Sequence, residues 1–181
     1  IQVNRRMIAE TDVVRLVTEM RGMLREFPTE AHPTFFEVVV VMALRYFAEQ
    51  KCDLVIWETG LGGRLDATNI VTPLASVITN IQFDHERWLG HTLANIASEK
   101  AGIIKPAVPA ITGATEPEAL AVIQDVARRK QSLLTLVTPD HTRHAPLDEI
   151  ELPLLGWHQR LNAAAALATV RELQAALPVA E

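Results

Sequence analysis

Short apolar runs alternate with longer helical segments along most of this chain, and that alternation constrains its fold more than any other feature. The runs predict buried β-strands at Leu54–Trp57, Ala75–Ile81, Val108–Thr112 and Leu133–Val137. The longer segments predict helices over Asp12–Glu26, Thr34–Gln50, Leu93–Ala101, Thr115–Arg129 and Gln159–Ala176. Strands and helices that alternate in this way indicate an α/β fold, with a mostly parallel sheet flanked by helices on both faces.

Local signals predict where several of these helices begin and end. Thr92 is expected to cap the third helix and Gly102 to stop it, while Thr115–Glu118 has the form of a capping box. The valine run 38–41 favours a strand locally, but the length of the segment around it favours a mostly buried helix. Residues 138–153 contain three prolines and two histidines, which predict an excursion or a short hairpin.

The composition limits the partners that this chain can have. Its 181 residues suffice for one sizeable core, so we expect a single domain over residues 1–181. The net charge of -5 argues against a general nucleic-acid binder, because no basic face offsets it. The longest purely apolar run, Val38–Leu44, is too short to span a membrane. Cys52 is the only cysteine and has no internal disulfide partner, which fits a reducing compartment and predicts a cytoplasmic protein.

A carboxylate and a glycine-rich loop follow the first predicted strand. Glu58 comes directly after the strand, and Gly60, Gly62 and Gly63 allow the next residues to turn tightly and approach a ligand closely. Ligands of open α/β sheets lie beyond the carboxyl ends of the strands, where Glu58 is expected. Mg²⁺ prefers such oxygen ligands and binds phosphate oxygens beside them. The alternative is a loop glutamate that pairs with Arg64.

Further candidate residues lie after the second predicted strand. Asp84 and His85 end that strand, and beside Glu58 they would contribute to a metal site; alternatively, His85 caps a helix or bonds to Asp84. Lys100 lies among apolar residues, and a partly buried lysine is readily deprotonated and chemically modified. The alternative for Lys100 is an ordinary solvated helix lysine.

Two other clusters lie near predicted helix starts. His158, Gln159 and Asn162 stand at the start of the last helix, where they either bind a planar ligand or simply cap backbone groups. Phe35 and Phe36 stand at the start of the second helix, where an aromatic pair is more often core than a ligand platform. The sequence contains neither a P-loop nor a dinucleotide-binding glycine fingerprint. The residues alone therefore predict an α/β protein with a magnesium–phosphate site that lacks its phosphate loop.

Three motifs taken together resemble the folylpolyglutamate synthase/dihydrofolate synthase family, relatives of the Mur ligases. The first motif is Glu58-Thr-Gly-Leu-Gly-Gly-Arg-Leu-Asp-Ala-Thr-Asn69. The second combines Ile78-Thr-Asn-Ile-Gln-Phe-Asp-His85, Leu89-Gly90 and Ser98-Glu-Lys-Ala-Gly-Ile103, in the family's order and spacing. The third is Gly156-x-His158-Gln159-x-x-Asn162, and the resemblance extends from Thr34 to about Ala168.

The resemblance implies an ATP-dependent ligase that joins L-glutamate to a folate or dihydropteroate carboxylate through an acyl phosphate, with ATP and Mg²⁺ as cofactors. The catalytic residues implied are Glu58 and His85, as magnesium ligands, and Lys100. Lys100 matches the family's carbamylated lysine, whose added carboxylate helps to hold a second metal. Asn162 matches a residue that contacts ATP. The residues matching the pteridine pocket are Thr34, Phe35, Phe36, Glu37, Leu65, Asp66 and Ala67, with Phe36 placed to stack on the ring.

The family also carries parts that this sequence does not contain, namely an upstream phosphate loop and a C-terminal domain. We therefore expect this chain to be the central part of a Mur-ligase-type ATPase domain, inactive alone. We also expect a monomer when full-length, with small molecules as partners and neither nucleic acid nor membrane. Two alternatives are a Mur-like ligase acting on a cell-wall precursor and a non-catalytic folate-binding module. The residues leave open whether the product is dihydrofolate, a polyglutamate tail or both.

Overall fold

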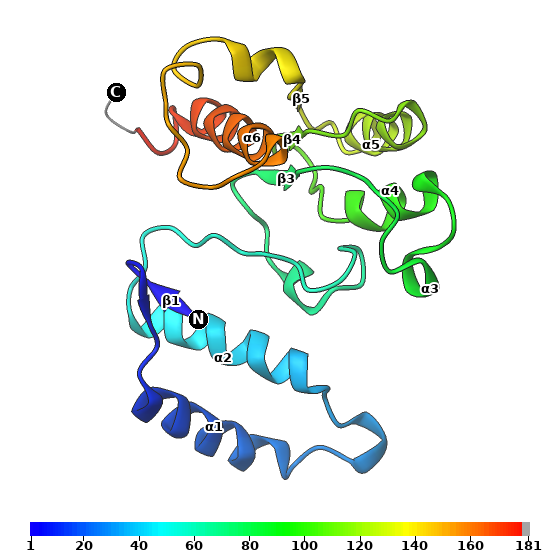
Figure 1. Ribbon diagram of the computed structural model, residues 1–181. Helices are drawn as coiled ribbons and strands as arrows, with labels where there is room; N and C mark the ends of the chain where they lie inside the picture. Colours follow the sequence, from blue (N-terminus) through cyan, green and yellow to red (C-terminus); the bar gives the residue numbers. More distant parts are fainter. Residues whose placement is uncertain (179–181) are drawn as a thin grey trace. The chain divides into compact units, whose positions relative to one another are not determined.

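The computed structural model describes residues 1–178, and these residues fall into two compact units. Unit 1 covers Ile1–Thr59, and unit 2 begins at Gly60. Figure 1 shows the order of the elements within each unit. None of the helices in this described part has both the length and the apolar character needed to cross a bilayer.

Unit 1 is a hairpin followed by two long helices. Its elements are β1 (Gln2–Val3), β2 (Arg6–Met7), α1 (Glu10–Leu24), the 3₁₀ turn η1 (Thr29–Ala31) and α2 (Phe35–Glu49). Both helices lie where the sequence predicts them, whereas the mixed sequence of residues 1–10 predicts no element. Leu16 and Met20 of α1 pack with Met42 and Tyr46 of α2, so the apolar faces of the two helices form a small core.

A capping box fixes the start of α2. Thr34 Oγ1 accepts a hydrogen bond from Glu37 N (3.3 Å), and Glu37 Oε2 accepts one from Thr34 N (2.7 Å). These bonds satisfy two backbone N–H groups that no helical carbonyl reaches. The helix start thereby outweighs the local strand preference of the valine run 38–41.

The strand predicted at Leu54–Trp57 is wrong. Residues 54–59 belong to no strand, and Leu54 and Ile56 are 57% and 93% exposed. A strand requires hydrogen bonds to a neighbour, and in unit 1 β1 and β2 pair with each other. The apolar pattern of residues 54–57 suits a strand, but the segment pairs with no strand in its own unit.

Unit 2 contains a three-stranded parallel sheet in the order β3–β4–β5. The strands are β3 (Ser76–Ile78), β4 (Ala110–Thr112) and β5 (Leu134–Leu136). Val77 pairs with Ile111, and Ile111 pairs with Thr135, so β4 is the central strand. Each strand lies inside a predicted one and is shorter. The α/β class with a parallel sheet is confirmed.

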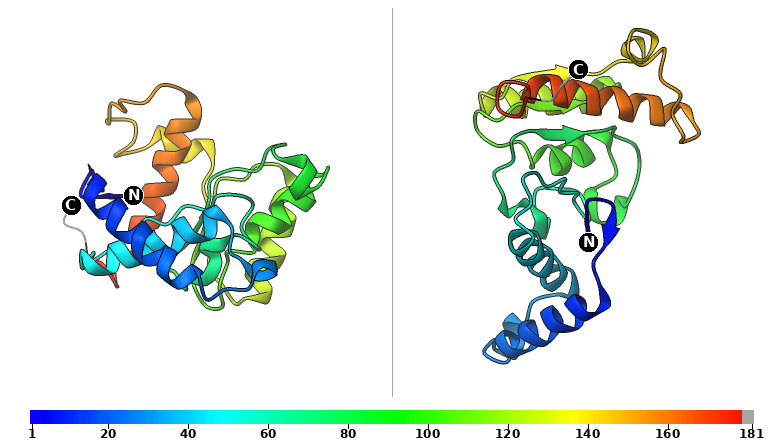
Figure 2. Two further views of the ribbon diagram at one scale, coloured as in Figure 1. Left: turned by 90° about the horizontal axis from the view of Figure 1, so that it is seen from below. Right: turned by 90° about the vertical axis from the view of Figure 1, so that its left-hand side faces the viewer.

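Helices cover both faces of this sheet. The helical elements of unit 2 are η2 (Ala67–Ile70), α3 (Glu86–Leu89), α4 (Leu93–Ala101), α5 (Pro117–Arg129), η3 (Pro139–Arg143) and α6 (Trp157–Leu173). Consecutive strand residues face opposite sides. Accordingly, Ala110 packs with Ile96 of α4 and Ile123 of α5, whereas Ile111 packs with Ala164 and other α6 residues. Figure 2 shows α6 running along one side of the sheet.

Helix α4 begins and ends where the sequence predicts. Thr92 Oγ1 accepts a hydrogen bond from Asn95 N (3.1 Å), and Gly102 is the C-cap residue. A glycine at the end of a helix often adopts the left-handed conformation that stops it. Gly102 does not, because its φ of -60° is available to any residue. A Cβ at Gly102 would lie 2.5 Å from Arg64 Cα, so the glycine permits a close approach of two backbones.

Helix α5 has no side-chain cap, so the capping box predicted at Thr115–Glu118 is wrong. The N-cap residue is Glu116, and Pro117 occupies the first helical turn. Proline has no N–H to be satisfied there and fixes the φ that a helix requires, so it sets the start by itself. Glu118 Oε1 instead accepts a hydrogen bond from Ala94 N of α4 (3.4 Å).

The segment 138–153 is an excursion rather than a hairpin. It opens with η3, in which the buried Thr142 donates a hydrogen bond from Oγ1 to Pro139 O (2.8 Å). Arg160 of α6 donates to Thr142 O (3.3 Å) and to Leu147 O (2.6 Å). The excursion is therefore fixed to α6 by one guanidinium group.

Candidate functional site

Asp84 and His85 lie where the sequence predicts, after the carboxyl end of β3. His85 immediately precedes α3 in the left-handed conformation (φ 49°, ψ 36°), which is costly for a non-glycine residue and recurs at functional sites. His85 Nε2 lies 3.6 Å from Asp84 Oδ2, beyond hydrogen-bond distance, and both side chains are exposed. His85 also makes no side-chain cap to α3. The imidazole is therefore available to a ligand.

Glu58 is exposed at the end of unit 1. Its carboxylate makes no hydrogen bond or ion pair to the described residues of that unit. Arg64, the partner suggested by the alternative interpretation, binds Glu99 within unit 2 through Nη2 and Oε1 (2.9 Å). The role of Glu58 as a metal ligand stays a prediction.

Lys100 lies in the last turn of α4 and is half-buried. Ala97 and Ala101 on either side of it are fully buried. Within the described part of the chain, Lys100 Nζ forms no hydrogen bond or ion pair. An unpaired amine beside apolar groups is open to modification. Its carbamylation stays a prediction.

These donors suit Mg²⁺ that is bound together with a nucleotide. Among residues 1–178, no group of three or more His, Cys, Asp or Glu side chains is arranged to hold a metal ion by itself. Mg²⁺ needs only one or two protein ligands when phosphate oxygens and waters complete its octahedron. Glu58 presents an exposed carboxylate in unit 1, which is a ligand of that kind. The magnesium-ligand roles of Glu58 and of His85 in unit 2 stay predictions.

In the segment 34–37, the polar residues and the aromatic residues have different roles. The Thr34 and Glu37 side chains are bonded to each other and to backbone groups in the capping box. Phe35 and Phe36 are 85% and 40% exposed. The interpretation of the two rings as core is therefore wrong. Exposed rings present faces on which a planar ligand can stack.

Asp66 stabilises its own loop. Its Oδ2 accepts hydrogen bonds from Gly60 N (3.0 Å) and Leu61 N (2.8 Å), and its Oδ1 accepts bonds from the N–H (2.9 Å) and hydroxyl groups of Thr68. Partial burial by itself would raise the pKa of Asp66, but these bonds outweigh burial and hold the pKa below its ordinary value. Leu65 and Ala67, on either side, make none of these bonds, and Leu65 is 79% exposed.

Replacing Asp66 with Asn should make the chain less stable at pH 7, with a difference that shrinks in acid. The folded pKa of Asp66 lies below its unfolded value of about 3.9, so the carboxylate contributes its full stabilisation above about pH 4. That contribution is lost as the pH falls through the folded pKa. Urea unfolding from pH 7 to pH 3 would measure it. Asp53→Asn, which replaces an exposed acid, is the control. The prediction is contradicted if the free energy of unfolding changes equally with pH in wild type and in Asp66→Asn.

The polar residues at the start of α6 do not cap that helix, so the capping interpretation is wrong. Gly156 is the N-cap residue and no side chain bonds there. Asn162 Nδ2 instead donates to Gln159 Oε1 (3.4 Å), and Gln159 Nε2 lies 3.2 Å from His158 Nε2. Asn162 is exposed, so a ligand can reach its amide group. The ATP contact of Asn162 stays a prediction.

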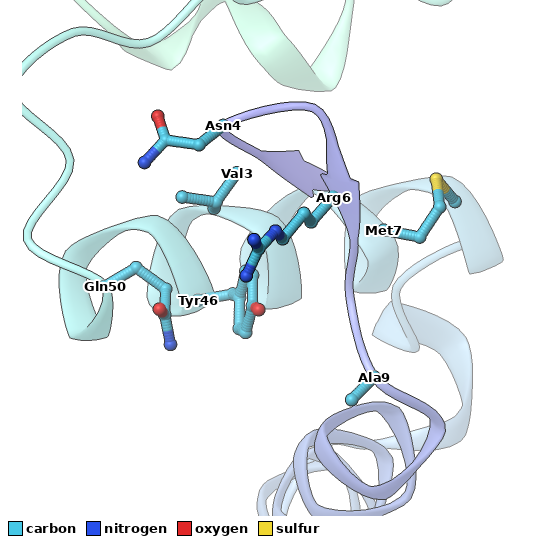
Figure 3. Close-up of a pocket in the computed structure, with 7 residues that line it drawn as sticks. All are labelled: Val3, Asn4, Arg6, Met7, Ala9, Tyr46 and Gln50. Atoms are coloured by element: carbon cyan, nitrogen blue, oxygen red, sulfur yellow. The ribbon is translucent and has the colours of Figure 1, made fainter.

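Unit 1 contains two open pockets. Figure 3 shows one of about 590 Å³ between the β1–β2 hairpin and α2, lined by Arg6, Tyr46 and Gln50 among others. None of the predicted site residues lines it. A second pocket of about 850 Å³ is bounded by residues 1–5, the end of α2 and the segment 51–58, and Glu58 is among its lining residues. Of the two, only the second includes a predicted site residue.

Arg64, Asn69 and Lys105, which lie outside the predicted site, form hydrogen bonds that hold neighbouring segments together. Asn69 Nδ2 donates to Arg64 O (3.1 Å) and Gly102 O (3.2 Å), and Lys105 Nζ donates to Asn69 O (2.8 Å). The sequence places Arg64 and Asn69 in a polar loop but does not show that their partners lie more than 30 residues away. The glycines at 62, 63 and 102, which allow the close packing, are the available signal.

Comparison with protein-family models gives no match. Among curated proteins, the chain is 41% identical to a dihydrofolate synthase/folylpolyglutamate synthase of Bacillus subtilis, over 92% of this chain and 44% of that protein. It is 38% identical to the corresponding Escherichia coli protein, over 88% of this chain and 43% of that protein. The chain thus spans less than half the length of these relatives.

Solved structures give the same result. A folylpolyglutamate synthase from Thermotoga maritima matches with a TM-score of 0.84 and 36% identity, over 99% of this chain and 45% of that chain. Escherichia coli FolC in complex with DHPP and ADP matches with a TM-score of 0.80 and 34% identity, over 99% and 44%. Motifs, sheet and matches agree, and the chain belongs to the folylpolyglutamate synthase/dihydrofolate synthase family.

Proposed function

We propose that the protein carrying this region is an ATP-dependent C–N ligase that adds L-glutamate to a carboxylate of folate or dihydropteroate. The observation that carries the proposal is the Glu58–Ile103 motif block, within a chain that matches named synthases over about nine-tenths of its length. These relatives are more than twice as long as the region matched, so the activity is assigned to the complete gene product. ATP is supported by relatives solved with an ATP analogue and with ADP.

The proposed reaction has two steps. A carboxylate oxygen of the pterin substrate attacks the γ-phosphorus of ATP, which forms an acyl phosphate and releases ADP. The amino nitrogen of glutamate then attacks the acyl carbon, which forms the amide and releases phosphate. Mg²⁺, when bound, would neutralise charge on the phosphate oxygens. Glu58 and His85 are the proposed magnesium ligands, and the exposure of both side chains, neither of which forms a hydrogen bond within its own unit among the described residues, supports this assignment.

The remaining site residues have proposed roles in substrate binding. The exposed rings of Phe35 and Phe36 support a stacking surface for the pteridine, and Leu65 adds an exposed apolar contact. Asp66 already accepts four hydrogen bonds within its loop, so its proposed contribution is to fix the backbone beside the ligand. Asn162 is proposed to contact ATP. The protein is further proposed to be a cytoplasmic monomer that binds these small molecules.

Substrate-dependent ADP release from the complete gene product tests this function. We expect release only when ATP, Mg²⁺ and glutamate are combined with dihydropteroate or a folate, and product mass spectrometry separates dihydrofolate formation from tail extension. Release that requires a nucleotide-linked muropeptide instead would indicate a Mur-like ligase. Tight folate binding without any ADP release would indicate a binding module. Both of these outcomes would overturn the proposal.

A further inference from the structure

Two candidate site residues in unit 2 depend on neighbouring helices for their position. His85 immediately precedes α3, and Lys100 lies in the last turn of α4. Leu89 of α3 packs with Ile96 and Ala97 of α4 in one buried cluster. The side chains of His85 and Lys100 have no hydrogen bonds of their own to fix them within the described residues. Whatever holds the two helices therefore sets the positions of both groups.

The loop 62–69 holds the end of α4 through its polar groups. Arg64 N donates to Glu99 O (2.8 Å), while Arg64 Nε and Nη2 both lie within hydrogen-bond distance of Glu99 Oε1 (3.2 and 2.9 Å). Asn69 Nδ2 joins Arg64 O to Gly102 O. Glu99 O also accepts a hydrogen bond from Gly102 N (3.3 Å), so Arg64 N adds a second bond to that carbonyl, whereas Asn69 supplies a donor to Gly102 O just beyond the helix end. The Arg64 cation also lies at the negative end of the helix dipole.

The backbone of the same loop lies directly against both helices. A Cβ at Gly63 would lie 3.1 Å from Lys100 O and 2.8 Å from an Ile103 methyl carbon. A Cβ at Gly62, whose φ is +67°, would lie 2.8 Å from the Leu89 side chain of α3. The loop is thus in contact with the backbone of Lys100 and with the residue that anchors α3. Glycine is favoured at Gly62 by the positive φ and at Gly63 by the two backbone carbonyls of α4 that a Cβ would crowd.

We infer that Arg64 and Asn69 are positioning residues that hold the last turn of α4 so that the Lys100 amine can be carbamylated. The inference rests on the proposed function. The reaction is the addition of the neutral amine nitrogen to the carbon of CO₂, which forms an N-carboxylate and releases one proton. The side-chain hydrogen bonds of Asn69 go to Arg64 O and Gly102 O rather than to the Lys100 amine, so Asn69 acts by fixing the carbonyl of Gly102, two residues after Lys100.

Asn69→Asp is the sharpest variant, because it keeps the size of the side chain and replaces the donating amide with a carboxylate facing two carbonyl oxygens. In the complete gene product supplied with ¹³C-bicarbonate and without ATP, we expect a weaker ¹³C carbamate signal than in wild type. We also expect faster amide exchange at Ile103 and Ile104, and about tenfold more bicarbonate for half-maximal ligase activity, as for losses of supporting contacts at metal sites. Arg64→Lys keeps the positive charge but loses the pair of guanidinium nitrogens that reach Glu99. It should change the carbamate signal, the amide exchange and the bicarbonate requirement less than Asn69→Asp does.

Arg128→Lys is the matched control, because Arg128 is an exposed arginine of α5 that pairs with Asp125 of the same helix and, among the described residues, forms no hydrogen bond or ion pair with the loop 62–69 or with α4. It should leave all three readouts unchanged. If wild type shows the carbamate signal and Asn69→Asp shows it at equal strength and equal bicarbonate demand, the positioning role is overturned while the proposed function stands. If wild type shows no glutamate-dependent ADP release, the proposed function fails instead. Should Asn69→Asp not fold, Asn69→Ala and Arg64→Lys carry the same comparison.

Discussion

Replacing Glu58 with Gln in the complete gene product should lower kcat by about 100- to 1,000-fold, the range seen when one electrostatic group of an active site is removed. The amide keeps the shape of the side chain but loses the negative charge that Mg²⁺ requires. Glu58 is exposed and unbonded within unit 1, so the thermal midpoint of unfolding should not change. ADP release at saturating substrates and calorimetric unfolding would measure the two effects. Mg²⁺ titration should show weaker activation of the variant.

Asp53→Asn provides the matched control for this substitution. Asp53 is an exposed carboxylate five residues before Glu58 in the same segment, with no hydrogen bond or ion pair to a described residue of unit 1. Its replacement removes the same charge and should leave kcat and the Mg²⁺ requirement unchanged. A Glu58→Gln protein that unfolds would show that Glu58 has a structural role instead, and one that keeps wild-type kcat would show that Glu58 does not bind the catalytic Mg²⁺.

Helix boundaries could be predicted from the sequence where one residue type provides the physical signal locally. Thr34 and Thr92 each accept a hydrogen bond from the backbone N–H three residues further along, so four consecutive residues suffice to predict the start of each helix. Thr115 has the same spacing to Glu118 but does not act, because Pro117 sets the helix start one residue later. The capping-box pattern and the proline predict different helix starts there, and the observed start is the one that Pro117 sets.

Strands could be predicted less well, because a strand depends on a distant partner. The runs around Val77, Ile111 and Thr135 pair with one another, and each forms a strand of only three residues. The run at Leu54–Trp57 has the same apolar character but no ladder partner in its own unit. Apolar pattern indicates that a segment is suited to pairing. It does not indicate what the segment pairs with.

The candidate site shows the same division between local and long-range information. The sequence indicates which groups can do chemistry, and Glu58, His85 and Lys100 indeed keep their donor atoms free of strong hydrogen bonds among the described residues. The sequence does not distinguish these three residues from Asp66 and Asn69, which lie in the same block of motifs but whose polar atoms bind the loop and the end of α4. That distinction requires the positions of partners such as Gly102, which lies 33 residues after Asn69.

Replacing Lys100 with Arg should lower kcat by about 100- to 1,000-fold, as for Glu58→Gln. Arginine keeps the positive charge and a similar length, but its guanidinium stays protonated and does not form a carbamate. Lys100 is half-buried with no bonded partner among residues 1–178, so a role for its charge in stabilising the fold is not expected. Wild-type activity should decline in CO₂-free buffer and return when bicarbonate is added, while the variant should not respond. Steady-state ADP release under the two conditions would measure this.

Lys100→Ala separates the loss of the amine from the loss of the carboxylate that it would carry. The small side chain leaves space at the end of α4, so added acetate should restore part of the activity of Lys100→Ala and none of the activity of Lys100→Arg. Lys130→Arg, at the exposed end of α5, is the control and should behave as wild type. If Lys100→Arg retains wild-type kcat, a positive charge suffices at this position and carbamylation has no role. If acetate restores neither variant while bicarbonate still controls wild type, the carboxylate must be joined to the Lys100 side chain to be correctly placed.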